Sequence, residues 1–258
     1  MLPPIRSTVS APYSNNAVLF ATKRSVSLMD NVLRAPEKPE KPWKPDWAPD
    51  PALLGEVEKL VGDVRSTTAS AFNQASIYVV PEGDVPVSYL EPILRTTIVG
   101  EHAKQWFTVT LVGRRREDGS NRRSGFTVSL LAKDKAVPFK LKVPGGGLQQ
   151  CTAWGVIGKD LAEAKGFSAA VYHDGKLVHA GRLGTDGTMQ SVESAPGHGE
   201  GDRLERWAEA QTSSVVVAVP GKATYAQWLE ALNGVALKCN EGECNLPRTV
   251  PVFLGTCR

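Results

Sequence analysis

The sequence lacks the features that would assign it directly to a membrane or to a nucleic-acid partner. No run approaches the roughly 18 consecutive apolar residues that a membrane-spanning helix needs. The start, Met1 to Pro4, lacks the order of basic, apolar and small residues that is typical of a signal peptide. The formal net charge is only +3, from 30 Lys and Arg against 27 Asp and Glu. This surplus is too small to indicate a nucleic-acid or anionic-membrane partner. We therefore expect a chain that neither inserts into a membrane nor directs its own export.

Catalytic and metal-binding patterns are also scarce. The histidines, His102, His173, His179 and His198, share no metal-ligand spacing, although His173 and His179 flank an Asp-Gly turn and are candidates for cross-strand neighbours. No serine has a nucleophile-elbow context, and no Cys–His pair can be assembled from the sequence. The glycine-rich run 143–147 lacks the Gly-Lys-Ser/Thr ending of a phosphate loop, which favours a flexible turn. We therefore expect no catalysis, no metal site and no cofactor.

The composition is otherwise typical of a folded chain. Hydrophobic residues make up 41% and charged residues 22% of the 258 residues, which is close to ordinary globular values. This length allows one large domain or two small ones. Half of the 18 prolines lie in the first 51 residues. Many belong to the segment APEKPEKPWKPDWAPDP, residues 35–51, which favours an extended polyproline II strap. The strap is a solvated connector in one interpretation; in the others, Trp43 and Trp47 anchor a partner or pack on their own domain.

Four cysteines leave three interpretations open. Cys239 and Cys244 flank Asn-Glu-Gly-Glu, in which a glycine can turn the chain, so we expect a disulfide between them. Free buried thiols and a zinc site are the alternatives, and zinc is disfavoured because Cys151 and Cys257 are not closely spaced. An even count with one close pair indicates an oxidising compartment such as a periplasm, although the missing signal-peptide pattern argues the other way.

The two halves of the chain predict the same order of elements. Apolar periodicity and turn residues mark them. The first half predicts a hairpin of residues 16–21 and 26–29, a helix over 53–64, a strand over 77–80, a short helix over 89–94 and a strand over 106–112. The second half predicts a hairpin of residues 169–173 and 176–179, a helix over 202–210, a strand over 214–219, a helix over 225–232 and a strand over 250–254. We interpret this order as an internal repeat. Pro92 must lie in the first turn of its helix or kink it.

Two alignments of the repeat compete. In one, Val80-Pro81 falls on Val219-Pro220, and Tyr89-Leu90-Glu91 falls on Trp228-Leu229-Glu230 at the same offset. In the other, Gly83 falls on Gly221, which requires a slip of one residue. The repeat is therefore a prediction about the order of elements more than about residue identity.

The second half resembles the periplasmic domain of the ExbD/TolR family. The residues that carry the resemblance are VVVAVPGKATYAQWLEAL, from Val215 to Leu232, together with the AVYHDGKLV hairpin and the predicted helix from Arg203 to Ala210 before them. Tyr225 occupies the usual place of the family's tyrosine, and Gly221-Lys222 stands where the family has a charged turn. The first half matches more loosely, with GDVPVSYLEPIL from Gly83 to Leu94 in the corresponding place.

This resemblance implies an α+β fold of two similar small units, each a mixed sheet with two helices packed on one face. We expect the first unit over residues 1–118, including the strap, and the second over 119–258. The family forms dimers and couples a proton-driven membrane motor to periplasmic partners or peptidoglycan, so the resemblance implies a non-enzymatic periplasmic interaction protein. The family's membrane helix with its proton-carrying Asp is absent from this sequence. Two units in one chain would resemble a built-in dimer.

Five arginines form the strongest candidate for partner contact. They lie in one predicted turn between two strands, and they are Arg114, Arg115, Arg116, Arg122 and Arg123. Such a hairpin tip can bind peptidoglycan carboxylates, phosphates or an acidic protein surface, with a solvated loop as the alternative. We rank Trp43 and Trp47 second. The competing function is a basic soluble module that binds nucleic acid or another anion, but no aromatic residues interleave with the arginines. Envelope proteins, peptidoglycan or a membrane motor complex are therefore the preferred partners.

Overall fold

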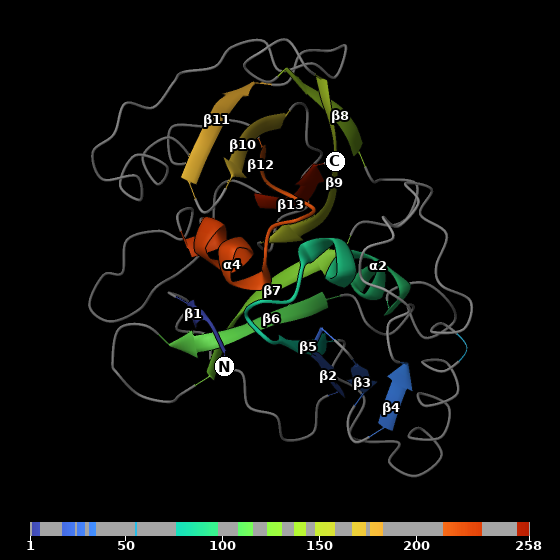
Figure 1. The fold of residues 1–258 in the computed structure, drawn as a ribbon. Coiled ribbons are helices and arrows are strands. Elements are labelled where there is room, and N and C mark those ends of the chain that lie inside the picture. Colours follow the sequence, from blue (N-terminus) through green and yellow to red (C-terminus); the bar gives the residue numbers. More distant parts are fainter. Residues whose placement is uncertain are drawn as a thin grey trace.

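Short runs of β-branched and apolar residues form the strands of the chain, shown in Figure 1 as a computed structural model. The structure describes residues 2–5, 17–23, 25–28, 31–34, 55, 76–97, 108–115, 123–130, 137–142, 148–157, 167–173, 176–182, 214–233 and 252–257. The strands of the first half are β1 (Pro4–Ile5), β2 (Ala17–Ala21), β3 (Val26–Leu28), β4 (Asn31–Arg34), β5 (Ser76–Pro81), β6 (Thr108–Arg115) and β7 (Arg123–Leu130). Those of the second half are β8 (Val137–Lys142), β9 (Leu148–Ile157), β10 (Phe167–His173), β11 (Lys176–Arg182), β12 (Ser214–Pro220) and β13 (Val252–Cys257). Two helices accompany them, α2 (Val87–Thr97) and α4 (Tyr225–Asn233).

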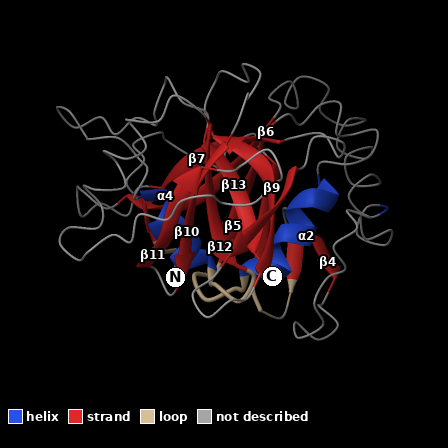
Figure 2. Cartoon of the chain, turned by 90° about the horizontal axis from the view of Figure 1, so that it is seen from above, coloured by secondary structure: helices blue, strands red, loops and turns tan. Residues whose placement is uncertain are grey.

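Within the described residues the strands form one mixed, thirteen-stranded sheet, so the expected α+β class with a mixed sheet is correct. The main path is β11-β10-β12-β13-β9-β7-β6-β5-β2-β3-β4, with β1 added to β6 and β8 added to β9. The two helices lie between the lower strands β5 to β7 and the upper strands β9 to β13 in Figure 1. Figure 2 shows the strands in the centre with α4 and α2 to either side. The helices expected over 53–64 and 202–210 lie outside the described residues, except for Gly55, which is helical.

The order and direction of the strands repeat. In the first half, β3 pairs antiparallel with β2, which pairs parallel with β5, which pairs parallel with β6. In the second half, β11 pairs antiparallel with β10, which pairs parallel with β12, which pairs parallel with β13. The antiparallel strands β7 and β9 join the two sets through β6 and β13. The repeated order of strands that the sequence predicted is therefore present, and β6 and β7, which lie on either side of the expected boundary, pair in the same sheet. The proposed division into two domains stays a prediction.

The central strands of each set are buried, which explains their unbroken apolar sequences. A parallel strand covered on both faces has a continuous hydrophobic run in place of an alternating one. Val79 and Val80 of β5 are buried, and so are the residues from Val216 to Val219 of β12. The helices contribute Leu90 and Leu94 of α2 to this core, and they contribute Trp228, Leu229 and Leu232 of α4.

The turns that follow β5 and β12 decide between the two alignments of the repeat. Residues 82–86 connect β5 to α2, whereas residues 221–224 connect β12 to α4, so the first connection is one residue longer. In the alignment of the two halves, the last strand residues Pro81 and Pro220 therefore match each other. The helices α2 and α4 match only after a shift of one residue, which is the alignment that places Gly83 on Gly221. This register puts Leu90, not Tyr89, at the position of Trp228, and both Leu90 and Trp228 are fully buried. The extension of the strand alignment into the helices was therefore wrong.

The two helix starts also differ in their capping. Thr224 begins α4 with a capping box, because its backbone N–H donates to Gln227 Oε1 at 2.8 Å and the Gln227 N–H donates to Thr224 Oγ1 at 3.3 Å. Pro86 stands at the corresponding place before α2, and its carbonyl accepts the N–H of Leu90 at 3.2 Å. Pro92 is the sixth residue of α2. It therefore lies in the helix interior, so the alternative that placed it in the first turn was wrong.

Candidate interaction surface

The predicted arginine turn is the end of a β-hairpin. Strands β6 and β7 pair antiparallel from Thr108↔Ser129 to Arg114↔Arg123. The first strand thus continues to Arg115, beyond the end expected at Val112, and the ladder brings Arg114 directly opposite Arg123. Arg116 and Arg122 lie outside the described residues, as do Trp43 and Trp47.

The N-terminal strand β1 adds to the same end of β6. Pro4 pairs with Arg114 and Ile5 pairs with Arg115 in a parallel ladder. The Arg114 N–H donates to the Pro3 carbonyl at 2.8 Å, and the Arg114 side chain is exposed. Regular backbone pairing on both sides therefore fixes the position of Arg114, so the basic end of the hairpin is held by the sheet.

Electrostatics make this hairpin end suited to an anion. Like charges directly opposite each other in an antiparallel ladder destabilise the pair. An anionic group bound near Arg114 and Arg123 would remove that repulsion, and a carboxylate or phosphate can accept two N–H bonds from one guanidinium. The arrangement is therefore suited to binding an anion.

The starts of α2 and α4 bind each other through a reciprocal set of backbone hydrogen bonds, which we call the turn junction. The Val87 N–H donates to the Ala223 carbonyl at 2.7 Å, and the Tyr225 N–H donates to the Val85 carbonyl at 2.8 Å. One residue further, the Ser88 N–H donates to Gly221 at 2.7 Å and the Ala226 N–H donates to Gly83 at 2.8 Å. An antiparallel bridge between Pro86 and Thr224 lies at the centre. Each turn thus satisfies N–H groups that a helix start leaves without intrahelical partners.

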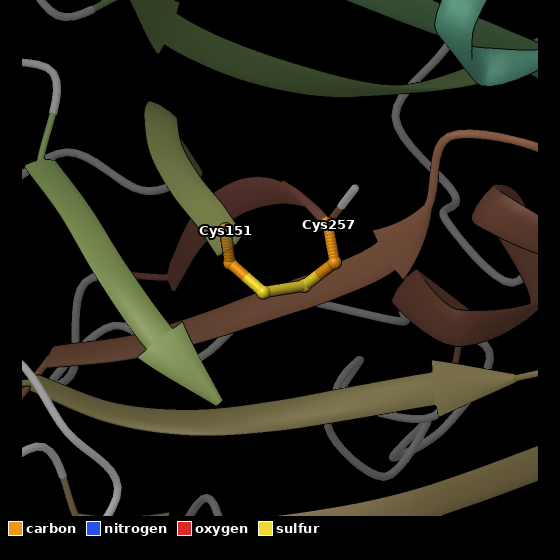
Figure 3. Close-up of a disulfide and its surroundings, with 2 residues drawn as sticks. All are labelled: Cys151 and Cys257. Carbon is orange, nitrogen blue, oxygen red and sulfur yellow. A yellow bond between two sulfur atoms is a disulfide. The ribbon is translucent and has the colours of Figure 1, made fainter. Parts of the chain in front are cut away.

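A disulfide stabilises the strand beside this junction. Cys151 of β9 and Cys257 of β13 lie directly opposite each other and form a disulfide, shown in Figure 3. Both residues are buried. The Cys257 carbonyl accepts the Gly221 N–H at 2.9 Å, and the Gly221 carbonyl in turn accepts the Ser88 N–H. The disulfide is therefore two hydrogen bonds away from the start of α2.

The sequence left Cys151 and Cys257 without an assigned partner because 106 residues separate them. Cys239 and Cys244, for which a disulfide was expected, lie outside the described residues. A disulfide elsewhere in the chain agrees with the general expectation of oxidised cysteines, whereas the 239–244 pairing stays a prediction.

The histidine expectation needs correction. His179 of β11 pairs with Val171, and His173 of β10 pairs with Lys176. Because His173 pairs at the turn itself and His179 pairs further along the ladder, His173 and His179 are not cross-strand neighbours. His102 and His198 lie outside the described residues. In the part of the chain that the structure describes, no three His, Cys, Asp or Glu residues form a group that could hold a metal ion.

Two side chains at the β1 end, those of Leu2 and Asn233, escaped sequence analysis. Leu2 packs against a buried cluster of Val18, Val80 and Val112. Asn233, at the end of α4, donates from Nδ2 to the Pro4 carbonyl at 3.2 Å. No local sequence pattern indicates these contacts. Asn233 and Pro4, for example, are 229 residues apart in the sequence. The double proline, which can accept but cannot donate backbone hydrogen bonds, was the available clue.

The chain has no match among known families, curated proteins or solved structures. Among the described residues, no helix has the length and apolar character needed to cross a bilayer.

Proposed function

We propose that this chain is a non-enzymatic interaction protein of the cell envelope, formed by two ExbD/TolR-like units, with the basic end of the β6–β7 hairpin as its partner-binding surface. The turn junction is the observation that carries the proposal. Val87 corresponds to Tyr225 in the repeat, and Ala223 corresponds to Val85. The bond from Val87 to Ala223 therefore has its symmetric counterpart in the bond from Tyr225 to Val85, as in the contact of a two-fold symmetric dimer. A built-in dimer of similar units is the simplest origin of such reciprocity.

The disulfide supports an extracytoplasmic site of action. Disulfides persist in oxidising compartments such as the bacterial periplasm and are rare in reduced cytosol. The Cys151–Cys257 bond is buried between two paired strands, where reductants have poor access. A periplasmic location is therefore part of the proposal.

The basic hairpin supports a partner that carries carboxylates or an acidic surface. Arg114 and Arg123 are neighbours by register, and Arg115 follows in the same strand. Peptidoglycan and envelope proteins both present carboxylates. The competing ligand with the same charge is nucleic acid, which the same arginines would bind through phosphates.

Co-sedimentation with purified, insoluble peptidoglycan tests the partner. We expect binding by the full chain and a marked loss in the Arg114→Glu/Arg123→Glu variant. A matched control, Arg34→Glu/Arg182→Glu, makes the same charge change on strands β4 and β11 and should bind as the parent does. Equal binding by all three proteins would contradict the proposed surface.

Two further measurements separate the remaining parts of the proposal. Light scattering should give a monomer, since the symmetric contact is already made inside the chain, whereas an obligate homodimer would contradict the built-in dimer. Salt-sensitive binding to arbitrary DNA, lost in the Arg114→Glu/Arg123→Glu variant, with no peptidoglycan binding would favour the nucleic-acid alternative.

A further inference from the structure

The edge of β6 is shared by two strands, and the second one is unusually short. β5 covers the edge from Thr108 to Leu111, and β1 covers Arg114 and Arg115. The strand β1 has only two residues, whereas strands average about five or six. We call the place that it occupies the β1 site, formed by the β6 edge at Arg114 and Arg115, the Asn233 side chain, and the cluster of Val18, Val80 and Val112.

The hydrogen bonds that the β1 site makes to Pro3 and Pro4 run in one direction. The Arg114 N–H donates to the Pro3 carbonyl at 2.8 Å, and Asn233 Nδ2 donates to the Pro4 carbonyl at 3.2 Å. Pro3 and Pro4 have no backbone N–H. In these two contacts the site donates and the segment accepts, which is the pattern that consecutive prolines can satisfy without leaving an amide unpaired.

The apolar contact fixes the position of the segment along the edge. Leu2 is half-buried against Val18, Val80 and Val112, and Pro3 is buried. A proline also restricts the residue before it to an extended conformation. The site thus selects an extended segment with an apolar residue followed by two prolines, and the parallel register then places a further apolar residue, Ile5, at Arg115.

The resident segment matches the site in shape but not in charge. The residue after Ile5 is Arg6, while β6 brings Arg114 and Arg115 to the same end of the sheet and β7 brings Arg123. A ligand with acidic residues after its apolar-Pro-Pro-apolar segment would be attracted to these arginines, and the chain's own sequence has no acidic residue directly after Ile5. The resident strand β1 has only two residues and pairs with β6 alone among the described strands, and short peripheral elements open locally at low cost.

We propose that the β1 site is a peptide-binding site for an extended apolar-Pro-Pro-apolar segment followed by acidic residues, supplied by a partner protein. Residues Leu2 to Ile5 occupy it within the chain and compete with the partner. The binding mode is strand addition to a sheet edge, in which backbone hydrogen bonds give affinity and side chains give specificity. The site shares Arg114 and Arg115 with the arginine surface of the proposed function but adds backbone and apolar contacts that select an extended segment, and it does not depend on the envelope location proposed above.

Fluorescence anisotropy with synthetic peptides on the full chain tests the proposal. The probe is labelled Leu-Pro-Pro-Ile-Glu-Glu, with Leu-Ala-Ala-Ile-Glu-Glu and Leu-Pro-Pro-Ile-Arg-Arg as comparison peptides. We expect the probe to bind with a Kd about five- to tenfold lower than the basic peptide at low salt, and the alanine peptide to bind more weakly than the probe. Equal affinity for all three peptides, or no binding of the probe, would overturn the proposal.

Two variants test the competition. Leu2→Ser weakens the contact of the resident segment with the site, so a larger fraction of the molecules has the site free. The apparent Kd of the probe should fall by the same factor by which this fraction rises. Asn233→Leu removes a donor and should weaken probe binding, while Asn31→Leu on β4 is the matched control and should leave it unchanged. A Leu2→Ser variant with the parent affinity, or an Asn233→Leu variant that binds as well as the parent, would contradict the site.

A nuclear magnetic resonance titration of the parent chain with the probe tests the site without any variant, in case Asn233→Leu fails to fold. In the parent chain, the probe should shift the Leu2 methyl resonances toward the positions of an unfolded peptide, because the probe displaces that side chain. It should at the same time shift the Arg114 amide resonance. Probe binding that leaves the Leu2 methyl resonances unchanged would place the peptide elsewhere and reject the proposal.

Discussion

The hydroxyl of Tyr225 donates a hydrogen bond to the backbone carbonyl of Val112 at 2.9 Å, across 113 residues of sequence. Val112 lies on β6 between the stretch that pairs with β5 and the stretch that pairs with β1. Its carbonyl would otherwise face the gap between those two strands without a ladder partner. Tyr225 is the first residue of α4 and is fully buried, so this bond connects the second helix to the sheet of the first half.

Replacing Tyr225 by Phe should destabilise the fold while leaving its packing intact. The change keeps the ring but leaves the buried Val112 carbonyl without its donor, which costs about 1–3 kcal/mol. Urea unfolding should give a lower midpoint with an unchanged slope. Tyr78→Phe makes the same chemical change at a half-buried tyrosine and should cost less. A Tyr225→Phe variant as stable as the parent would mean that the hydroxyl contact contributes nothing.

Removing the Cys151–Cys257 disulfide should lower the stability substantially. The bond closes a loop over a sequence separation of 106 residues, for which the chain-entropy treatment gives about 4–5 kcal/mol. The Cys151→Ala/Cys257→Ala variant should unfold at a lower denaturant concentration than the parent. Loss of the disulfide should also weaken the turn junction, because the Cys257 carbonyl accepts the Gly221 N–H.

The two effects of this disulfide can be measured separately. Hydrogen exchange at the Ser88 and Ala226 amides reports on the turn junction, and we expect faster exchange in the alanine variant. The Val128 amide, on β7, reports on the sheet away from the bond and is the internal comparison. Unchanged exchange at Ser88 and Ala226 would show that the disulfide and the turn junction are independent.

Local patterns in the sequence were sufficient for the elements that have a strong period or a turn signal. The hairpin of β10 and β11 follows from Asp-Gly between apolar runs, and α4 follows from the spacing of Tyr225, Trp228 and Leu232. Both predictions are confirmed. The hairpin of β6 and β7 was also expected, because a polar, arginine-rich turn separates two apolar runs.

Contacts between distant segments could not be derived in the same way. The partner of Cys151 is set by the register between β9 and β13, which no local pattern encodes. The sequence allowed an extra residue before α2 as one of two alignments, and only the reciprocal hydrogen bonds of Val87 and Tyr225 define the register. The role of Pro3 and Pro4 depends on Arg114 and Asn233, which a reading of the N-terminus alone does not connect.

The ion pair between Lys23 and Asp84 should give a small pH dependence of stability. The two side chains approach to 2.6 Å, and the hydrogen bond from Lys23 is the main cause that lowers the pKa of Asp84 below its ordinary value of 3.8. A lowered folded-state pKa means that the contribution is present above the unfolded-state pKa and is lost as the pH falls through the folded-state value. Both side chains are more than half exposed, so solvent and salt screen the effect.

Titration of the Asp84 carboxyl by nuclear magnetic resonance measures this directly. In the Lys23→Met variant the pKa of Asp84 should rise toward 3.8, and the loss of stability on acidification should be correspondingly smaller. The Lys222→Met variant removes an exposed lysine from the other turn and is the control. An Asp84 pKa that is the same in the parent and in Lys23→Met would contradict the assigned cause.

Gly255 of β13 pairs with Ala218 of β12 where an added side chain would have no room, so Gly255→Ala should destabilise the chain. A Cβ added there would lie 2.8 Å from Val216 Cγ1 and 3.1 Å from Ala218 Cβ, which forces neighbouring groups to move. Such overpacking costs about 1–3 kcal/mol. Val216→Ala creates space at the same place, so the Gly255→Ala/Val216→Ala variant should lose less stability than the sum of the two single changes. Gly55→Ala is the matched control, because its added Cβ meets nothing within 4 Å and alanine favours a helix. Additive losses in the double variant would show that the Val216 contact does not explain the glycine.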